Sequence, residues 1–257
     1  MLKNLFRKKA RETFLGEALI PDGQRVYAIG DVHGRNDLLQ ILLKKIADDD
    51  VARGGGHSEI VFLGDLIDRG PDSCGVVETA MQLQRERGSV RFLMGNHEEV
   101  FLASMAGSDR ATRFFTRIGG KETILSYEIS MKEYMDLDNE ALTARLPEII
   151  PQSHVDFVRS FEDQIVIGDY AFVHAGVRPN VPLAEQKAKD LHWIREDFLS
   201  ASQLHEKMIV YGHTINEEVV EADNRIGIDT GAYYTENLTA IALEGRDRWY
   251  LDTRDTE

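Results

Sequence analysis

Three short apolar runs, each ending in a glycine, constrain the fold of this chain more than any other feature. They cover residues 25–30, 60–64 and 90–95. Apolar residues recur on one helical face between Asn36 and Asp50, and again in the stretch before Gly88. Strand–helix–strand–helix–strand, with roughly 30 residues from one strand to the next, is typical of βαβ units. The first half therefore predicts a parallel sheet.

The pattern changes after the third run. Residues 97 to about 161 look mostly helical, with breaks expected at Gly119-Gly120 and around Pro147 and Pro151. Short strands then follow in hairpin-like succession, so we expect the second half to be more antiparallel. The expected strands cover residues 165–167, 171–174, 208–212, 226–229, 238–243 and 248–251.

The domain organisation follows from the absence of a linker rich in proline and serine. We expect one interlocked α/β domain over residues 25–257, after a basic N-terminal segment at residues 1–24. A helical insertion at about residues 106–161 should overhang the functional site and select the substrate. Its small core is expected to be aromatic: Phe114, Phe115, Tyr127 and Tyr134.

Polar, ligand-type residues follow each of the three N-terminal strands where the strand ends. Because ligands bind at the carboxyl ends of strands in an open α/β sheet, we expect these loops to share one edge. Two later strands end in histidine. A single strand-end histidine fits a buried structural role equally well, but the whole set points to a metal site. The segments are Gly30-Asp31-Val32-His33-Gly34, Gly64-Asp65-Leu66-Ile67-Asp68-Arg69-Gly70, Gly95-Asn96-His97-Glu98, His174-Ala175-Gly176 and Gly212-His213-Thr214.

The ligand chemistry is carboxylate, imidazole and amide oxygen without thiolate, which suits manganese, iron or zinc but not a cysteine-type structural zinc site. Six ligands are too many for one ion with open positions, and they fit two ions that share a bridging carboxylate. Two such ions polarise a phosphoryl group and lower the pKa of a bridging water. The six candidates are Asp31, His33, Asp65, Asn96, His174 and His213.

The charge balance of the chain agrees with a site in which bound metal ions supply the positive charge. Lysine and arginine number 30 against 44 acidic residues, a net charge of −14. So acidic a chain is a poor binder of nucleic acid, which requires a basic face, and we expect no nucleic acid partner.

The expected location is cytoplasmic, because the single cysteine, Cys74, allows no disulfide within the chain. No apolar stretch approaches the ~18 residues of a membrane helix, and the basic start lacks the apolar region of a secretory signal. For that basic segment, a short frayed or self-packed helix fits better than contact with a membrane surface. The oligomeric state is left open.

Five motifs in order, GDVHG, GDLIDRG, GNHE, HAG and GHT, resemble the phosphoprotein phosphatase family of metallophosphoesterases. The bacterial and phage branch, typified by the bacteriophage lambda serine/threonine phosphatase, is the most similar in its motifs. The resemblance runs from about Val26 to Leu243. It implies a calcineurin-like α/β/β/α sandwich of two mixed sheets flanked by helices, with the helical insertion added.

The resemblance also implies roles for the site residues. Two divalent ions are expected, manganese first and iron or zinc as alternatives. Asp31, His33 and Asp65 would hold the first ion, and Asp65 would bridge to a second held by Asn96, His174 and His213.

The implied chemistry is in-line attack by a metal-bridging hydroxide without a phosphoenzyme. His97, oriented by Asp68, would protonate the leaving alkoxide. Arg69 and Arg195 would hold the phosphate oxygens, because a guanidinium suits bidentate contact. The alternative for Arg195 is a surface salt bridge with Glu196 or Asp197.

The expected activity is that of a metal-dependent phosphatase on phosphomonoesters, first on phosphoserine and phosphothreonine of a protein or peptide, with some phosphotyrosine. The alternative is a symmetrical diadenosine tetraphosphatase or other nucleotide polyphosphate hydrolase. Such relatives lack the counterpart of Asp68 and carry aspartate in place of Glu98, so this sequence favours the protein phosphatase. Residues 118–127 resemble a segment that both groups share.

Two other classes fit less well. A catalytically silent binding relative would predict an eroded ligand, and every ligand is intact. A cysteine phosphatase needs Cys-x5-Arg, but position 80 is alanine. We therefore expect Cys74 to be a small buried residue at the start of the second helix.

Overall fold

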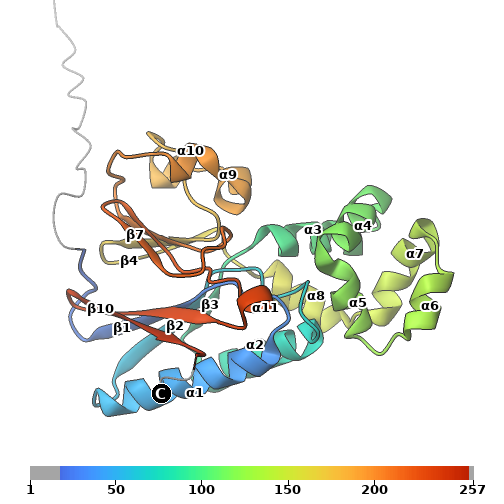
Figure 1. The fold of residues 1–257 in the computed structure, drawn as a ribbon, viewed down its shortest axis with the longest axis horizontal. Helices are drawn as coiled ribbons and strands as arrows, with labels where there is room; N and C mark the ends of the chain where they lie inside the picture. The colour runs from blue at the N-terminus through green and yellow to red at the C-terminus, as the bar shows by residue number, and fades with distance from the viewer. Residues whose placement is uncertain (1–17, 255–257) are drawn as a thin grey trace, which may run out of the picture.

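Two five-stranded sheets form the body of the protein, with strand orders β10-β9-β1-β2-β3 and β4-β5-β6-β8-β7. The structure is a computed structural model that describes residues 18–254. Residues 1–17 of the predicted basic segment therefore lie outside the described residues. The sheets lie one above the other, and helices cover the outer face of each (Figure 1). The predicted sandwich of two mixed sheets flanked by helices is confirmed.

The first sheet has the predicted parallel start. Strands β1 (Gln24–Ile29), β2 (His57–Phe62) and β3 (Val90–Phe92) pair in parallel. Helices α1 (Asn36–Ala52) and α2 (Ser73–Arg87) connect them and cover the outer face (Figure 1). The chain returns at its end, because β9 (Thr239–Glu244) pairs antiparallel with β1, and β10 (Asp247–Asp252) with β9.

The second sheet is mixed rather than simply antiparallel. Strand β5 pairs in parallel with β6 and β6 with β8, whereas β4 and β7 add antiparallel edges. The sequence did not predict β7 or the short helices outside this sheet. The strands are β4 (Gln164–Ile167), β5 (Tyr170–Val173), β6 (Met208–Tyr211), β7 (Val220–Ala222) and β8 (Arg225–Gly227); the helical segments are η2 (Leu183–Glu185), α9 (Ala188–Trp193), α10 (Glu196–Leu199) and α11 (Ala232–Thr235).

Strand β1 shows how the two layers are held. Successive side chains of a strand point to opposite faces. Val26 and Ala28 therefore pack between the two sheets, while Tyr27 and Ile29 pack against α1 and α2. Strands buried on both faces explain why the sequence shows continuous apolar runs rather than alternation.

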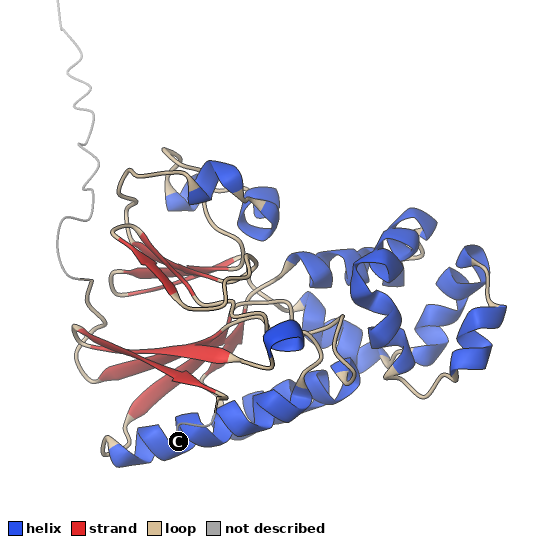
Figure 2. Cartoon of the chain, viewed as in Figure 1, coloured by secondary structure: helices blue, strands red, loops and turns tan. Residues whose placement is uncertain are grey.

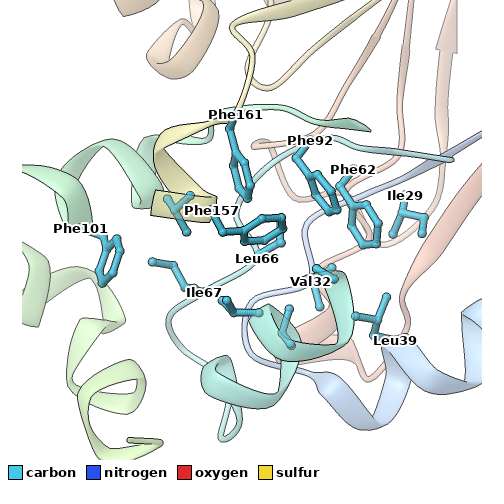
Figure 3. Packing of buried hydrophobic residues seen from close by; sticks show 14 of the residues in the cluster. Ile29, Val32, Leu39, Phe62, Leu66, Ile67, Phe92, Phe101, Phe157 and Phe161 are labelled. Carbon is cyan, nitrogen blue, oxygen red and sulfur yellow. The ribbon is translucent and has the colours of Figure 1, made fainter. Parts of the chain in front are cut away.

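The helical insertion, predicted at about residues 106–161, extends from one end of the sandwich and is joined to it by α3 (Figure 2). It is anchored by aromatic rings, since Phe92 of β3 stacks on Phe62 at 4.9 Å and on Phe161 at 5.2 Å, while Phe157 meets Phe92 edge-on (Figure 3). The segments are α3 (Asn96–Met105), α4 (Asp109–Phe115), η1 (Thr116–Gly120), α5 (Lys121–Leu125), α6 (Met131–Asp136), α7 (Asn139–Ile149) and α8 (Gln152–Arg159).

The expected helix breaks are partly right. Gly119 has φ 120° and interrupts the helical backbone, and Pro151 caps the start of α8. The break at Pro147 is wrong, because Pro147 lies inside α7, close to its end. Burial of Leu142 and Leu146 on the same helix outweighs the backbone hydrogen bond that the proline removes.

The aromatic core of the insertion is smaller than predicted. Phe115 and Tyr127 are buried, and Tyr134 packs partly against them. Phe114 is 42% exposed and is not a core residue. Among residues 18–254 as a whole, the insertion included, no helix has the length and apolar content needed to cross a membrane.

Candidate metal centre

The predicted ligands lie where strands of both sheets end. Asp31 and His33 follow β1, Asp65 follows β2, and Asn96 and His97 open α3 just after β3. From the second sheet, His174 follows β5 and His213 follows β6. Convergence of two sheets explains how residues 182 positions apart meet, as the backbone N–H of His213 donates to both Asp31 oxygens at 3.0 and 3.1 Å.

Two groups of side chains that could hold a metal ion share Asp65. In the first, the Nε2 atoms of His33 and His97 lie 3.5 and 3.8 Å from Asp65 Oδ2. In the second, His174 Nε2 lies 3.5 Å from Asp65 Oδ1 and 3.1 Å from His213 Nδ1. A carboxylate that faces one group with each oxygen is placed to bridge two ions.

The other two predicted ligands, Asn96 and Asp31, each contact a residue of the second group. Asn96 Oδ1 is 3.1 Å from His174 Nε2, so it joins the second group. Both carboxylate oxygens of Asp31 accept a hydrogen bond from the backbone N–H of His213. The first group contains His97, whereas the sequence predicted Asp31 as the third ligand of that ion. The role of His97, acid or ligand, is therefore a point for experiment.

Backbone carbonyls orient two of the imidazoles. His33 Nδ1 lies 2.8 Å from the Ile67 oxygen, and His174 Nδ1 lies 2.8 Å from the Leu63 oxygen. A carbonyl accepts only, so each Nδ1 carries the proton and each Nε2 presents a lone pair toward Asp65. His213 Nε2 is buried without a hydrogen-bond partner. A nitrogen lone pair that accepts no hydrogen bond, such as that of His213 Nε2, is free to coordinate a metal ion.

Electrostatics also favour bound cations. Burial raises the pKa of Asp31, and the nearby carboxylates of Asp229 and Asp65 raise it further. Burial lowers the pKa of His33 and His213, and that of His174 to about 3, so these rings are neutral. Neutral imidazoles are the form that binds metal, and divalent ions would relieve the crowding of carboxylates. The residues present fit a two-ion centre.

His97 is held by its neighbours. Its Nδ1 lies 2.6 Å from Asp68 Oδ2, and Arg69 Nη2 donates to its Nε2 at 3.1 Å. Thr123 of α5 in turn donates to Asp68 Oδ1 at 2.6 Å. Burial lowers the pKa of His97. The helical insertion therefore helps to orient the His97–Asp68 pair.

Five residues of the site adopt left-handed backbone, which is uncommon outside glycine and strained. Their φ angles are 44° at His33, 49° at Asp65, 74° at Asp68, 67° at Arg69 and 62° at His213. Such strain persists only where the surroundings fix the backbone.

Glu98 supplies much of that fixation, and the sequence did not predict this role. Its carboxylate accepts hydrogen bonds from the backbone N–H groups of Asp65 and Leu66 at 2.8 Å, and of Gly95 at 3.0 Å. Burial raises the pKa of Glu98 to about 8. Glu98 thus fixes the loop after β2. This structural role explains why a glutamate stands at position 98, without reference to the substrate.

Two glycines allow the close approach of the strand ends. A Cβ at Gly95 would lie 2.2 Å from Asp65 Oδ1, and one at Gly212 would lie 2.1 Å from Asp31 Oδ1. Any side chain there would displace a predicted ligand.

Arg195 does not form the salt bridge considered as its alternative. Arg178, not Arg195, forms an ion pair with the carboxylate of Asp197, and it forms a second ion pair with Asp190 at 2.5 Å. Arg195 is exposed, yet its positive charge lowers the pKa of His97 and His213, so it lies close to the centre.

Asp229 and Tyr233 belong to the site but were not among its predicted residues. Asp229 follows β8 and is 3% exposed, and burial raises its pKa to about 6. Tyr233 places its ring 5.4 Å from that of His33 and 4.8 Å from the guanidinium carbon of Arg69. An acidic residue at a strand end was the available signal for Asp229.

Residues 24–242 match the family described as calcineurin-like phosphoesterase. Curated relatives named bis(5'-nucleosyl)-tetraphosphatase PrpE [asymmetrical] are similar along most of their length. The protein from Anoxybacillus flavithermus is 26% identical over 238 residues, covering 83% of this chain and 88% of its own. That from Bacillus subtilis is 27% identical over 233 residues, with the same coverage.

Solved structures of several phosphatase classes share the fold. One assigned as a diadenosine tetraphosphatase has a TM-score of 0.61 and 20% identity, covering 91% of this chain and 98% of its own. A serine/threonine phosphatase from Saccharomyces cerevisiae has a TM-score of 0.59 and 15% identity, covering 91% and 81%. Likeness at this identity establishes the fold alone.

Proposed function

We propose, from the premise that this chain belongs to the calcineurin-like phosphoesterase family, that its substrate is a dinucleoside polyphosphate. Phosphoester hydrolysis itself follows from the family and from the two metal-type groups around Asp65. The substrate class rests on one observation. The relatives named as bis(5'-nucleosyl)-tetraphosphatases match 83% of the chain at 26–27% identity.

This proposal reverses the order of the two candidates that the sequence suggested. The curated relatives carry the tetraphosphatase name rather than that of a lambda phosphatase-like branch. Glu98, read from the sequence as a mark of a protein phosphatase, is explained by the backbone amides that it binds. Asp68 is the remaining feature in favour of that class.

The metal-binding part of the proposal keeps the six predicted ligands. Asp31, His33 and Asp65 would hold one divalent ion, and Asp65, Asn96, His174 and His213 a second. Bound there, the two ions would polarise the phosphoryl group and lower the pKa of a water molecule. Manganese, with iron or zinc as alternatives, and a cytoplasmic location remain predictions.

The remaining side chains would bind phosphate and move a proton. Arg69 and Arg195 carry guanidinium groups near the centre, suited to bidentate contact with phosphate oxygens. The Nδ1–H of His97 donates to Asp68, and Nε2 accepts from Arg69. Nε2 would therefore first take up a proton, leaving the Arg69 contact, and then deliver that proton to the leaving oxygen.

A serine/threonine protein phosphatase is the second candidate, and the His97–Asp68 pair favours it. An alkoxide is a poor leaving group and requires a general acid. The leaving group of a phosphoric anhydride is a stabilised phosphate and requires one much less. An oriented histidine is thus more necessary for a phosphomonoester of serine than for a dinucleoside polyphosphate.

A turnover assay on metal-stripped, manganese-reloaded protein would decide between the two. It would compare diadenosine tetraphosphate with a phosphoserine or phosphothreonine peptide. We expect kcat/KM to favour the dinucleotide by about a hundredfold, equivalent to roughly 2.7 kcal/mol of transition-state preference. A comparable preference for the peptide would establish the second candidate instead.

The products identify the cleaved bond. Attack at the central anhydride of diadenosine tetraphosphate gives two ADP molecules, whereas attack at an outer one gives ATP and AMP. The relatives are named as asymmetrical, so we expect ATP and AMP. Two ADP would restore the symmetrical reaction that the sequence suggested.

A further inference from the structure

A groove of about 560 Å³ lies between α3, the helix that begins with Asn96 and His97, and the segment formed by α4 and η1. Three arginines line it: Arg110 and Arg113, three residues apart on α4, and Arg117 on η1, the π-helix that follows. All three are exposed.

These arginines differ from most others in the protein because they have no partner. Arg113 lies four residues after Asp109, the spacing of a helical ion pair, and yet no such pair forms. In an acidic chain, arginines are normally paired. Within residues 18–254, the arginines without a hydrogen bond or ion pair are Arg85, Arg110, Arg113, Arg117 and Arg195. Four of these five lie at the groove or the metal centre.

The acidic residue of the groove does not neutralise it. Glu99 Oε2 lies 2.8 Å from His192 Nδ1 and accepts from Trp193 Nε1 at 3.0 Å. Its carboxylate is therefore occupied by groups of α9. The groove presents net positive charge, although the whole chain has a net charge of −14.

Two lining residues of the groove stand close in the chain to residues of the centre or to a residue that contacts them. Arg117 stands two residues before Gly119, whose carbonyl accepts from the backbone N–H of Arg69 at 3.1 Å. Glu99 stands two residues after His97. The groove and the centre therefore share α3 and the contact between Gly119 and Arg69.

An aromatic pair, exposed Phe114 and half-buried Trp193, borders the row. Phe114 of α4, 42% exposed, lies 6.2 Å from the ring of Trp193, with 30° between the ring planes. Trp193 also lines a second hollow together with Arg195. Aromatic rings beside guanidinium groups offer a surface on which a nucleobase can stack.

We propose that this groove binds the phosphate chain and base of a nucleoside polyphosphate that extend beyond the phosphate held at the metal centre. Its arginine row takes the additional phosphates, and Phe114 with Trp193 takes the base. The inference rests on the proposed function, because a phosphomonoester has no additional phosphate to place there.

The test replaces two of the three groove arginines, Arg113→Ala together with Arg117→Ala, and uses Arg85→Ala as a matched control. Arg85 is also unpaired but lies on α2. We expect the double variant to lower the ratio of kcat/KM for diadenosine tetraphosphate to that for p-nitrophenyl phosphate at least tenfold. Arg85→Ala should leave the ratio at the wild-type value. An unchanged ratio in the double variant would overturn the inference.

A binding assay in EDTA separates the groove from the metal centre. We expect calorimetry to give at least tenfold weaker binding of both ATP and inorganic tripolyphosphate to the double variant. Phe114→Ala should weaken ATP alone, because tripolyphosphate has no base. Equal loss of both ligands in Phe114→Ala, or wild-type affinity in the double variant, would contradict the proposed subsite.

The two proposals can fail separately. A wild-type protein that does not hydrolyse diadenosine tetraphosphate overturns the proposed function, whereas the EDTA assay still decides whether the groove binds polyphosphate. If the double substitution instead raises KM for a phosphopeptide and leaves tripolyphosphate binding unchanged, the groove serves a peptide and the inference is wrong.

Discussion

The metal centre and the arginine groove use charged side chains in opposite ways. At the centre, His97 is bonded to Asp68 and the amide of Asp65 to Glu98, all of them buried. In the groove, Arg113 and Arg117 are exposed and have no partner among the described residues. Side chains that must keep a fixed geometry are held by hydrogen bonds to their neighbours. Groups that bind an anion arriving from solvent keep their hydrogen-bond donors free.

The backbone shows the same contrast. Loops of the centre hold non-glycine residues such as Asp65 and Asp68 at positive φ, a conformation that costs about 1–3 kcal/mol each. The groove arginines of α4 stand on ordinary helix. Strain is thus confined to the part of the site where positions must be fixed to fractions of an ångström.

The largest effect is expected at the residue shared by both metal groups. Asp65→Asn should remove metal from both groups and lower kcat on the order of a thousandfold or more. The fold should persist, because the last three residues of β2, Ile60, Val61 and Phe62, are apolar and buried. Elemental analysis and circular dichroism check this, and wild-type metal content would disprove the bridging role.

The next effect separates the two possible roles of His97. His97→Asn should keep the metal content and lower kcat by about 10²–10⁴ on a phosphoserine peptide. The loss should be smaller on diadenosine tetraphosphate, whose leaving group needs less protonation. Loss of metal in this variant would make His97 a ligand, as its place in the first group permits.

Adjacent phenylalanines compare a buried with an exposed position on one helix. Phe115 is fully buried and Phe114 is 42% exposed. Phe115→Ala should lower the free energy of unfolding by about 3–5 kcal/mol. Phe114→Ala should change it by less than about 0.5 kcal/mol. Urea denaturation measures both, and equal losses would place Phe114 in the core after all.

The smallest effect concerns pH. Burial tends to lower the pKa of His192, but its contacts with Glu99 and Asp163 raise it overall. Its contribution to stability is therefore complete below the unfolded pKa of about 6.5 and is lost as pH rises through the folded pKa. His192→Gln should remove this dependence, worth less than about 1 kcal/mol. Thermal melts of both proteins from pH 5.5 to 8.5 would reveal it, and identical profiles would exclude His192 as the source.

The sequence by itself predicted the parallel start of the first sheet, because apolar periodicity and strand-end glycines are local signals. It also predicted which strand ends carry ligand-type residues, since Asp31, Asp65 and His174 come within three residues of the end of a largely buried strand. Those signals depend on a few neighbouring residues, so they can be read without knowing the rest of the chain.

Only the tertiary structure decided the remainder. Three features join segments far apart in sequence: the return of β9 and β10 to the first sheet, the hydrogen bonds from the backbone of Asp65 and Leu66 to Glu98, and the contact between Trp193 and Phe114. Pairing, hydrogen bonding and burial at such separations depend on how the two layers pack. For the same reason the unpaired state of the groove arginines is invisible in the sequence, because a missing partner is known only once every neighbour has been placed.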